Sequence, residues 1–214
     1  MPVVTDSHLK TFVEAAHRIG THQLLICSSG NLSWRLNEEI MLISQTGSWL
    51  PYLSKDQVSI SRLTDGMIIN NVNPSMDSGF HFGIMRQRKD INVILHFQSL
   101  YATAIACLPE PPTDFNVINE IPMFIGQIAL LPYICLGSPE LGINVTEAMK
   151  THDLVVLRNH GQVVVGKNFD DVIQKALFFE LACGIIIRSN HQAIRLTEEQ
   201  ICDMDKYMKK FPLI

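Results

Sequence analysis

Two histidines in this 214-residue chain stand where metal ligands are often found. His96 lies near the end of the apolar run at residues 91–97, and His160 lies in a short loop between two β-prone segments. Side chains alternate along a strand, so Gln98 points to the same side as His96 and could add an amide oxygen. A lone histidine at a strand end is more often packed or hydrogen-bonded than metal-bound. A metal site therefore requires the fold to bring these residues together.

Three polar loops carry groups that could bind a phosphate. Two of them, at residues 28–33 and 44–48, are rich in hydroxyl groups and contain a glycine, and the third places Ser75 after Pro74 at an expected helix start. Backbone amides in such loops, like those at a helix N-terminus, attract anions. Each loop taken alone is equally typical of an ordinary turn.

A carboxylate lies next to the third loop. Asp77 follows Ser75 by two residues at the start of the same helix. It could cap the helix, ligate a metal or act as a base, and capping is the commonest of these roles. His81 lies one helical turn later and could orient the carboxylate.

The elements that must position these residues follow from the hydrophobic pattern. Helical spacing predicts helices at residues 6–20 (with a cap at Asp6 or Ser7), 80–85, 98–108, 138–150 and 169–194, and a capping box at residues 197–200 opens a last one. Strand patterns predict hairpins at residues 31–43 and 58–70, a buried central strand at 91–97, and β segments at 128–136, 154–157 and 163–165. We expect one domain over residues 1–214, of the α/β or layered α+β class, with a mostly antiparallel sheet flanked by helices.

Composition narrows the classes of function. The formal net charge is −4 and the basic residues are scattered, which argues against a nucleic-acid partner. The longest apolar runs are shorter than the roughly 20 residues that a membrane span needs. The first ten residues lack the apolar core of a signal peptide, and the five cysteines form no CxxC pair. These features predict a cytoplasmic protein with reduced thiols and no membrane partner.

In their order and spacing, the motifs resemble the class II aldolase and adducin family, and within it the L-fuculose-phosphate aldolases. The matching segments are Ser29-Gly30-Asn31-Leu32-Ser33, Thr46-Gly47, Pro74-Ser75 with Asp77 two residues later, Phe80-His81, His96, residues 133–137 and Asn159-His160-Gly161. The resemblance covers roughly residues 9–187. Each segment is weak alone, whereas the ordered set is specific.

The resemblance implies a zinc-dependent lyase, or one using another divalent metal, that forms a homotetramer. Such an enzyme cleaves a ketose 1-phosphate to dihydroxyacetone phosphate and an aldehyde through an enediolate, whose charge the metal stabilises while a carboxylate moves the proton. The residues that this assigns to the substrate phosphate are Gly30, Asn31, Thr46, Gly47 and Ser75. The metal ligands would be His96, His160 and, weakly, Gln98, with Asp77 as the catalytic acid and base.

The sequence departs from the family at this site. Gln98 replaces the second histidine of an HxH motif and offers only a neutral oxygen. Met76 replaces a serine hydroxyl, Asp77 is one methylene shorter than the usual glutamate, and residues 118–119 lack the tyrosine that a neighbouring subunit contributes. Two alternatives therefore stay open: a non-catalytic member like the adducin head domain with a degraded metal site, and a dehydratase or epimerase of the same family.

Overall fold

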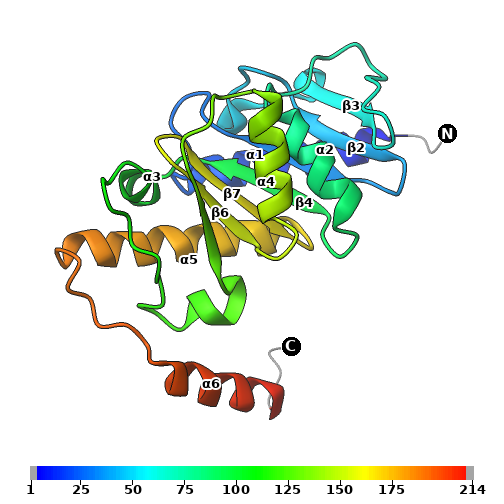
Figure 1. The fold of residues 1–214 in the computed structure, drawn as a ribbon. Helices are drawn as coiled ribbons and strands as arrows, with labels where there is room; N and C mark the ends of the chain where they lie inside the picture. Colours follow the sequence, from blue (N-terminus) through cyan, green and yellow to red (C-terminus); the bar gives the residue numbers. More distant parts are fainter. Residues whose placement is uncertain (1–3, 211–214) are drawn as a thin grey trace.

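A seven-stranded sheet forms the centre of the protein in this computed structural model, which describes residues 4–210 (Figure 1). The strands follow the order β3-β2-β1-β4-β7-β6-β5 across the sheet. Their bounds are β1 Asn31–Arg35, β2 Ile40–Ser44, β3 Val58–Arg62, β4 Val93–Phe97, β5 Ile128–Leu131, β6 Leu154–Leu157 and β7 Gly161–Gly166. Every neighbouring pair is antiparallel except β5 and β6. The predicted mostly antiparallel sheet in a single layered domain is confirmed.

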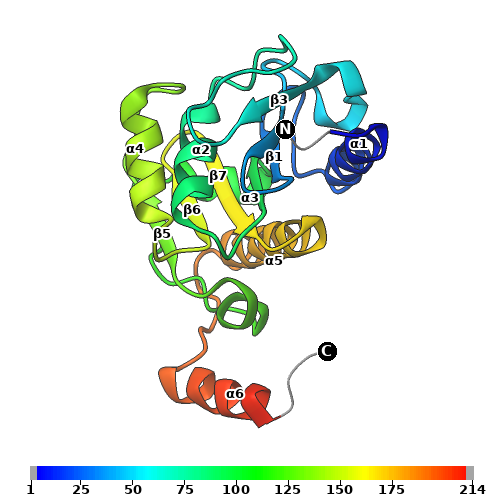
Figure 2. The same cartoon turned by 90° about the vertical axis from the view of Figure 1, so that its right-hand side faces the viewer.

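Helices cover both faces of the sheet, as Figure 2 shows from the side. Helices α1 (Asp6–Thr21), α3 (Leu100–Ala106) and α5 (Phe169–Arg188) pack on one face. Helices α2 (Ser78–Gln87) and α4 (Pro139–Ala148) pack against each other on the opposite face. Each layer buries its own cluster of apolar side chains, and this burial is the main force that holds the helices to the sheet. Short helical turns lie at Leu50–Tyr52, Lys55–Gln57 and Ile121–Ile125.

The last helix, α6 (Glu198–Lys210), lies away from the sheet (Figure 1, Figure 2). None of its residues is buried. The capping box predicted at its start is present, since Thr197 and Gln200 exchange backbone-to-side-chain hydrogen bonds of 2.9 and 3.2 Å. Across the described part of the chain, no helix combines the length and apolar content of a membrane span.

Strand β4 occupies the middle of the sheet and is buried along its whole length. Val93, Leu95 and Phe97 face the cluster beneath α1, α3 and α5, whereas Ile94 faces the cluster beneath α2 and α4. Coverage of both faces explains why the sequence shows an unbroken apolar run here. His96 shares the side of Ile94 by alternation, so it emerges on the α2 and α4 side at the end of the strand.

Most predicted helix starts are confirmed, and one cap is corrected. Ser138 caps α4, because its hydroxyl accepts a hydrogen bond from the Leu141 backbone amide at 3.1 Å. Helix α1 is capped by Thr5 rather than by Asp6 or Ser7. Asp6 instead occupies the first turn, where its negative charge interacts favourably with the helix dipole and stabilises the helix.

Three predicted elements are shorter than expected. The second arm of the hairpin at residues 58–70 makes only a single bridge, between Ser61 and Ile68, on the edge of β3 that faces away from β2. Helix α5 ends at Arg188 rather than at residue 194, since Asn190 and His191 adopt positive φ angles of 52° and 62°. Strand β5 ends before Pro132, which has no amide hydrogen for the ladder.

Candidate functional site

His96 is held with one ring nitrogen free. Its side chain is almost fully buried, and Nδ1 lies 2.9 Å from the Gln162 carbonyl oxygen. A carbonyl oxygen only accepts, so Nδ1 carries the hydrogen and Nε2 keeps a lone pair. Burial lowers the pKa of His96 below its ordinary value, despite the opposing effect of Asp77. A neutral imidazole fixed in this way is the form that binds a metal.

His160 lies beside His96 with its ring edge-on, and the two ring centroids are 4.8 Å apart. The turn that carries it, between β6 and β7, passes through Asn159 at φ 55°. Burial, and next the neighbouring His96, lowers the pKa of His160 to about 4. Its Nδ1 is buried and has no hydrogen-bond partner. Gly161 permits the close packing, because a Cβ there would lie 2.6 Å from the Gln98 side chain and 3.1 Å from the His96 ring.

Asp77 faces these histidines instead of capping α2. It occupies the position before the helix, yet its side chain makes no capping hydrogen bond. Its Oδ2 lies 3.9 Å from His96 Nε2 and accepts a hydrogen bond of 2.9 Å from the Asn31 side-chain amide. Its Oδ1 is buried without a partner. An unpaired buried carboxylate oxygen is costly, so its presence indicates a role beyond packing.

The three side chains fit a divalent metal ion. One donor atom from each of Asp77, His96 and His160 lies within 4.8 Å of the other two. Ligands of one tetrahedral zinc ion lie about 3.4 Å apart, given bonds of about 2.1 Å, so small rotations would close the set. Asp77 Oδ1 and His160 Nδ1 are also buried without a hydrogen-bond partner, which is compatible with an ion at this site. The predicted approach of His96 to His160 is confirmed.

Gln98 lies at the edge of this cluster. Strand β4 ends at Phe97, and the Gln98 backbone amide donates to the Leu24 carbonyl at 3.1 Å. Its half-buried side chain lines the cavity that His96 and His160 line. Its position is compatible with a weak ligand, and that role stays a prediction.

The polar loops meet the three-residue cluster in one cavity of about 310 Å³. A backbone bridge between Gln45 and Pro74 joins the second loop to the third, and the Ser75 amide donates to the Ser44 carbonyl at 3.0 Å. The predicted phosphate-binding residues that line the cavity are Gly30, Asn31, Thr46, Gly47 and Ser75. No lysine or arginine is among its lining residues, so an anion would meet hydroxyl and amide donors. The structure thus gathers every candidate site residue into one place.

Gly30 must be a glycine for this arrangement. Its φ is 104°, and a Cβ there would lie 2.6 Å from the His96 carbonyl oxygen and 2.3 Å from the Leu25 side chain. The first loop therefore crosses directly over the end of β4.

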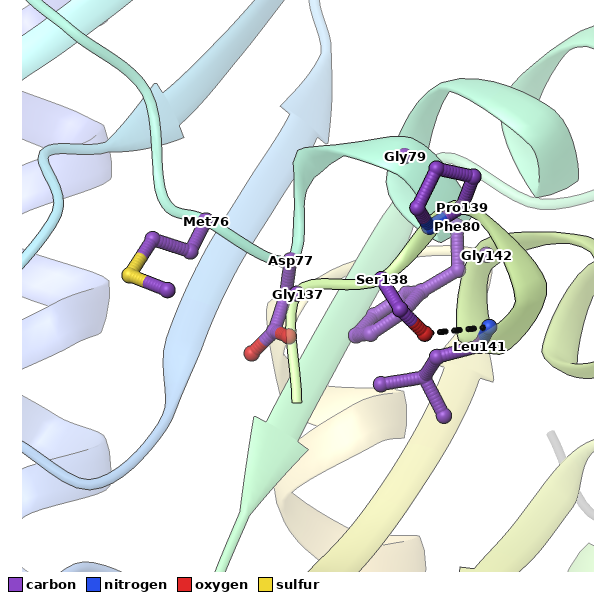
Figure 3. A pocket seen from close by; sticks show the side chains of 9 residues that line it. All are labelled: Met76, Asp77, Gly79, Phe80, Gly137, Ser138, Pro139, Leu141 and Gly142. Carbon is purple, nitrogen blue, oxygen red and sulfur yellow. Dashed lines mark hydrogen bonds between the residues drawn. The ribbon is translucent and has the colours of Figure 1, made fainter. Parts of the chain in front are cut away.

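A second cavity, of about 300 Å³, shares Met76 and Asp77 with the first (Figure 3). The first turns of α2 and α4 form its walls. The Ser138 hydroxyl accepts the hydrogen bond from the Leu141 amide that caps α4. Met76 lines both cavities, is 63% exposed, and would contact a Cβ at Gly137. A thioether therefore occupies the position where a hydroxyl was expected.

The sequence did not reveal the hydrogen bonds that hold Asp77. The spacing suggested that His81 could orient Asp77, and the structure links the two through a third residue: His81 contacts Asn31 and Ser33, and Asn31 contacts Asp77. Asn31 and Ser33 alternate onto one side of β1, which was the available signal. Which helix side chain faces them depends on how α2 packs on the sheet, and spacing along the chain does not record that.

Comparison with known proteins points in one direction. Residues 10–187 match the class II aldolase and adducin N-terminal domain. A 3-oxo-tetronate 4-phosphate decarboxylase of Haemophilus influenzae is 28% identical over 205 residues, which cover 92% of this chain and 91% of that protein. An L-fuculose phosphate aldolase of Methanococcus maripaludis is 30% identical over 173 residues, or 81% of this chain and 92% of that protein. The crystal structure of YgbL from Escherichia coli superposes with a TM-score of 0.84 at 24% identity, covering 92% of this chain and 97% of that one.

Proposed function

This chain belongs to the class II aldolase and adducin family, and from that premise we propose that it is a metal-dependent carbon-carbon lyase acting on a small phosphorylated sugar. One observation carries the proposal: Asp77, His96 and His160 converge on the cavity that the three polar loops also line. The cluster argues against the non-catalytic alternative. A site that no longer binds a metal has no reason to keep Asp77 Oδ1 and His160 Nδ1 buried without a hydrogen-bond partner.

Each part of the cavity has a task in the proposed reaction. The amides and hydroxyls of residues 28–31, 45–47 and 75 would bind the phosphate and fix the position of the sugar. His96, His160 and Asp77 would hold a divalent ion, zinc being the expected one, which when bound supplies positive charge toward an enediolate. Gln98 would add at most a weak neutral contact. The Asp77 carboxylate would move the proton.

Two reactions share this enediolate and differ in what leaves. In aldol cleavage of a ketose 1-phosphate, Asp77 takes the proton of the hydroxyl on the departing carbon, an aldehyde leaves, and the proton returns to the enediolate carbon to give dihydroxyacetone phosphate. In decarboxylation of a 3-oxo sugar-acid phosphate, carbon dioxide leaves without a base, and only the returning proton is needed. The first is our leading candidate. The name of the Haemophilus influenzae relative favours the second.

The released fragment distinguishes these candidates. Protein purified without chelator would first be analysed for metal content, and then incubated with ketose 1-phosphates and 3-oxo sugar-acid phosphates. We expect bound divalent metal and either an aldehyde or carbon dioxide among the products. Dehydration or epimerisation without carbon-carbon cleavage would identify a dehydratase or epimerase. A protein that neither binds added metals nor converts any substrate would overturn the proposal.

Asp77→Asn tests the assigned acid and base. We expect lyase activity to fall by at least about 100-fold, because the amide cannot accept the proton, while thermal unfolding stays cooperative. Asp56→Asn is the matched control, since Asp56 is exposed and lies outside the cavity. Turnover retained in Asp77→Asn would exclude Asp77 from this role.

The homotetramer and the cytoplasmic location stay predictions.

A further inference from the structure

His81 is buried between α2 and β1 and has a partner at each ring nitrogen. Its side chain is fully inaccessible to solvent and stacks on Phe80. Nδ1 lies 2.7 Å from Ser33 Oγ, and Nε2 lies 2.5 Å from Asn31 Oδ1. The chain of hydrogen bonds continues from Asn31 Nδ2 to Asp77 Oδ2 at 2.9 Å. It therefore runs from Ser33 through two side chains to Asp77.

The direction of every hydrogen bond in this chain follows from the carboxylate. An ionised Asp77 can only accept, so the NH₂ group of Asn31 must face it. The Asn31 carbonyl oxygen then faces His81 and can only accept, which places a hydrogen on His81 Nε2. Burial lowers the pKa of His81 well below its ordinary value, which keeps the ring neutral. Nδ1 is thus an acceptor and the Ser33 hydroxyl donates to it.

The opposite tautomer would break this order. With the hydrogen on Nδ1, the bare Nε2 would face the Asn31 oxygen, and two buried acceptors would oppose each other. Turning the amide would cure that contact and create the same conflict at Asp77. The Nε2-protonated ring of His81 is therefore what keeps the Asn31 amide donating to Asp77.

We propose that His81 is a positioning residue, which acts through the Asn31 amide to hold the Asp77 carboxylate beside His96, with Oδ2 hydrogen-bonded and Oδ1 left without a partner. The assignment rests on the proposed function for its purpose. It also gives Asn31 a second task, beyond its expected contact with a phosphate. A purely structural residue at this buried position could be apolar, whereas a positioning residue needs a donor at the place of Nε2.

Two variants separate the ring nitrogens. His81→Gln places its amide near Nε2 and can still donate to Asn31, whereas His81→Asn reaches only the place of Nδ1 and loses that contact. Zinc binding, measured by competition with a chromophoric chelator, should weaken by at least about tenfold in His81→Asn and stay near wild type in His81→Gln. His17→Leu is the control, because His17 bonds only the Leu53 carbonyl, away from the cavity.

Nuclear magnetic resonance tests the assignment without substrate or metal. In ¹⁵N-histidine-labelled wild type, His81 should show a protonated Nε2 and a bare Nδ1, and the Asn31 side-chain amide should exchange slowly with solvent. A protonated Nδ1, or equal zinc affinities in folded His81→Gln and His81→Asn, would overturn the inference. If both variants fail to fold, the wild-type tautomer alone decides. A wild type that binds no metal would overturn the proposed function, and the tautomer and amide exchange would still test His81.

Discussion

At the scale of single residues, Gln98 limits how strongly the cluster can hold an ion. Its side chain lies in the cavity beside His96 and His160, but an amide oxygen is a weaker zinc ligand than an imidazole nitrogen. An ion at this site would then be held by two imidazoles and one carboxylate. Weak or substoichiometric zinc in the wild-type protein follows from this set.

Gln98→His should restore a nitrogen ligand without moving β4. We expect zinc affinity to rise by at least about tenfold, which corresponds to about 1.4 kcal/mol. Chelator competition measures it, with His160→Ala expected to bind no zinc. Gln87→His is the control, because Gln87 lies at the far end of α2. An unchanged affinity in Gln98→His would show that residue 98 does not face the ion.

The buried His81 makes stability depend on pH. Because its folded pKa is lowered, the unfolded chain binds more protons once pH falls below about 6.5. The stability contributed by neutral His81 is thus full above that pH and is lost as pH falls toward the folded pKa, by up to about 1.4 kcal/mol per pH unit. His81→Gln should flatten this loss relative to wild type. Urea unfolding of metal-free wild type and His81→Gln at pH 7 and pH 5 measures how much free energy of unfolding each protein loses between the two pH values. Equal losses in the two proteins would contradict the expectation.

At the scale of elements, close packing of α2 on α4 sets where Asp77 stands. Gly79 and Gly83 of α2 both lie near α4, but they differ in the space around them. A Cβ at Gly83 would lie 2.1 Å from Thr146 Oγ1, whereas a Cβ at Gly79 would find Gly142 at 3.9 Å. A methyl group at Gly83 would push the helices apart, whereas one at Gly79 would lie at an ordinary van der Waals distance from α4.

Gly83→Ala should therefore destabilise the protein by about 1–3 kcal/mol, because the added methyl overpacks the helix contact. Gly79→Ala, on the same helix, should be neutral or slightly stabilising. Urea denaturation of both variants gives the comparison. Equal stability of the two would show that the helices adjust freely at Gly83.

The elements also show how far sequence reasoning reaches. The apolar run at residues 91–97 predicted β4 because both of its faces are buried, and the order of the loops predicted which residues share the cavity. The pattern of residues 67–70 suited a strand, but along the outer edge of β3 these residues form only the bridge between Ser61 and Ile68. The apolar content after Arg188 suited a helix, but a left-handed turn at Asn190 and His191 ends it. Tertiary pairing and local backbone geometry decided these cases.

At the scale of the whole molecule, several features suit assembly with further copies. Helix α6 stands apart from the body without a buried residue of its own. Near the cavity, Tyr133 is 65% exposed and Leu136 is 51% exposed. Exposed apolar groups next to a site are typical of an interface.

We expect a homotetramer in solution, as the family resemblance implies. Light scattering coupled to size exclusion at micromolar concentration should give four times the 24.1 kDa of one chain. Leu136→Glu places a charge in the exposed patch and should reduce the mass, whereas Leu181→Glu, on the outer side of α5, serves for comparison. A single monomeric species of the wild type would count against the assembly.

The cavity around Asp77, His96 and His160 has no lysine or arginine among its described lining residues, and this has a consequence for how a phosphorylated ligand would enter and leave. A phosphate held by amide and hydroxyl dipoles is recognised by the geometry of its oxygens, and attraction from fixed positive charge on the protein wall contributes nothing. Ionic strength then has little to screen at the wall. Apart from an ion held by Asp77, His96 and His160, a ligand would gain no steering from charge in this lining, and no ion pair between its phosphate and a lysine or arginine would have to break before the product departs.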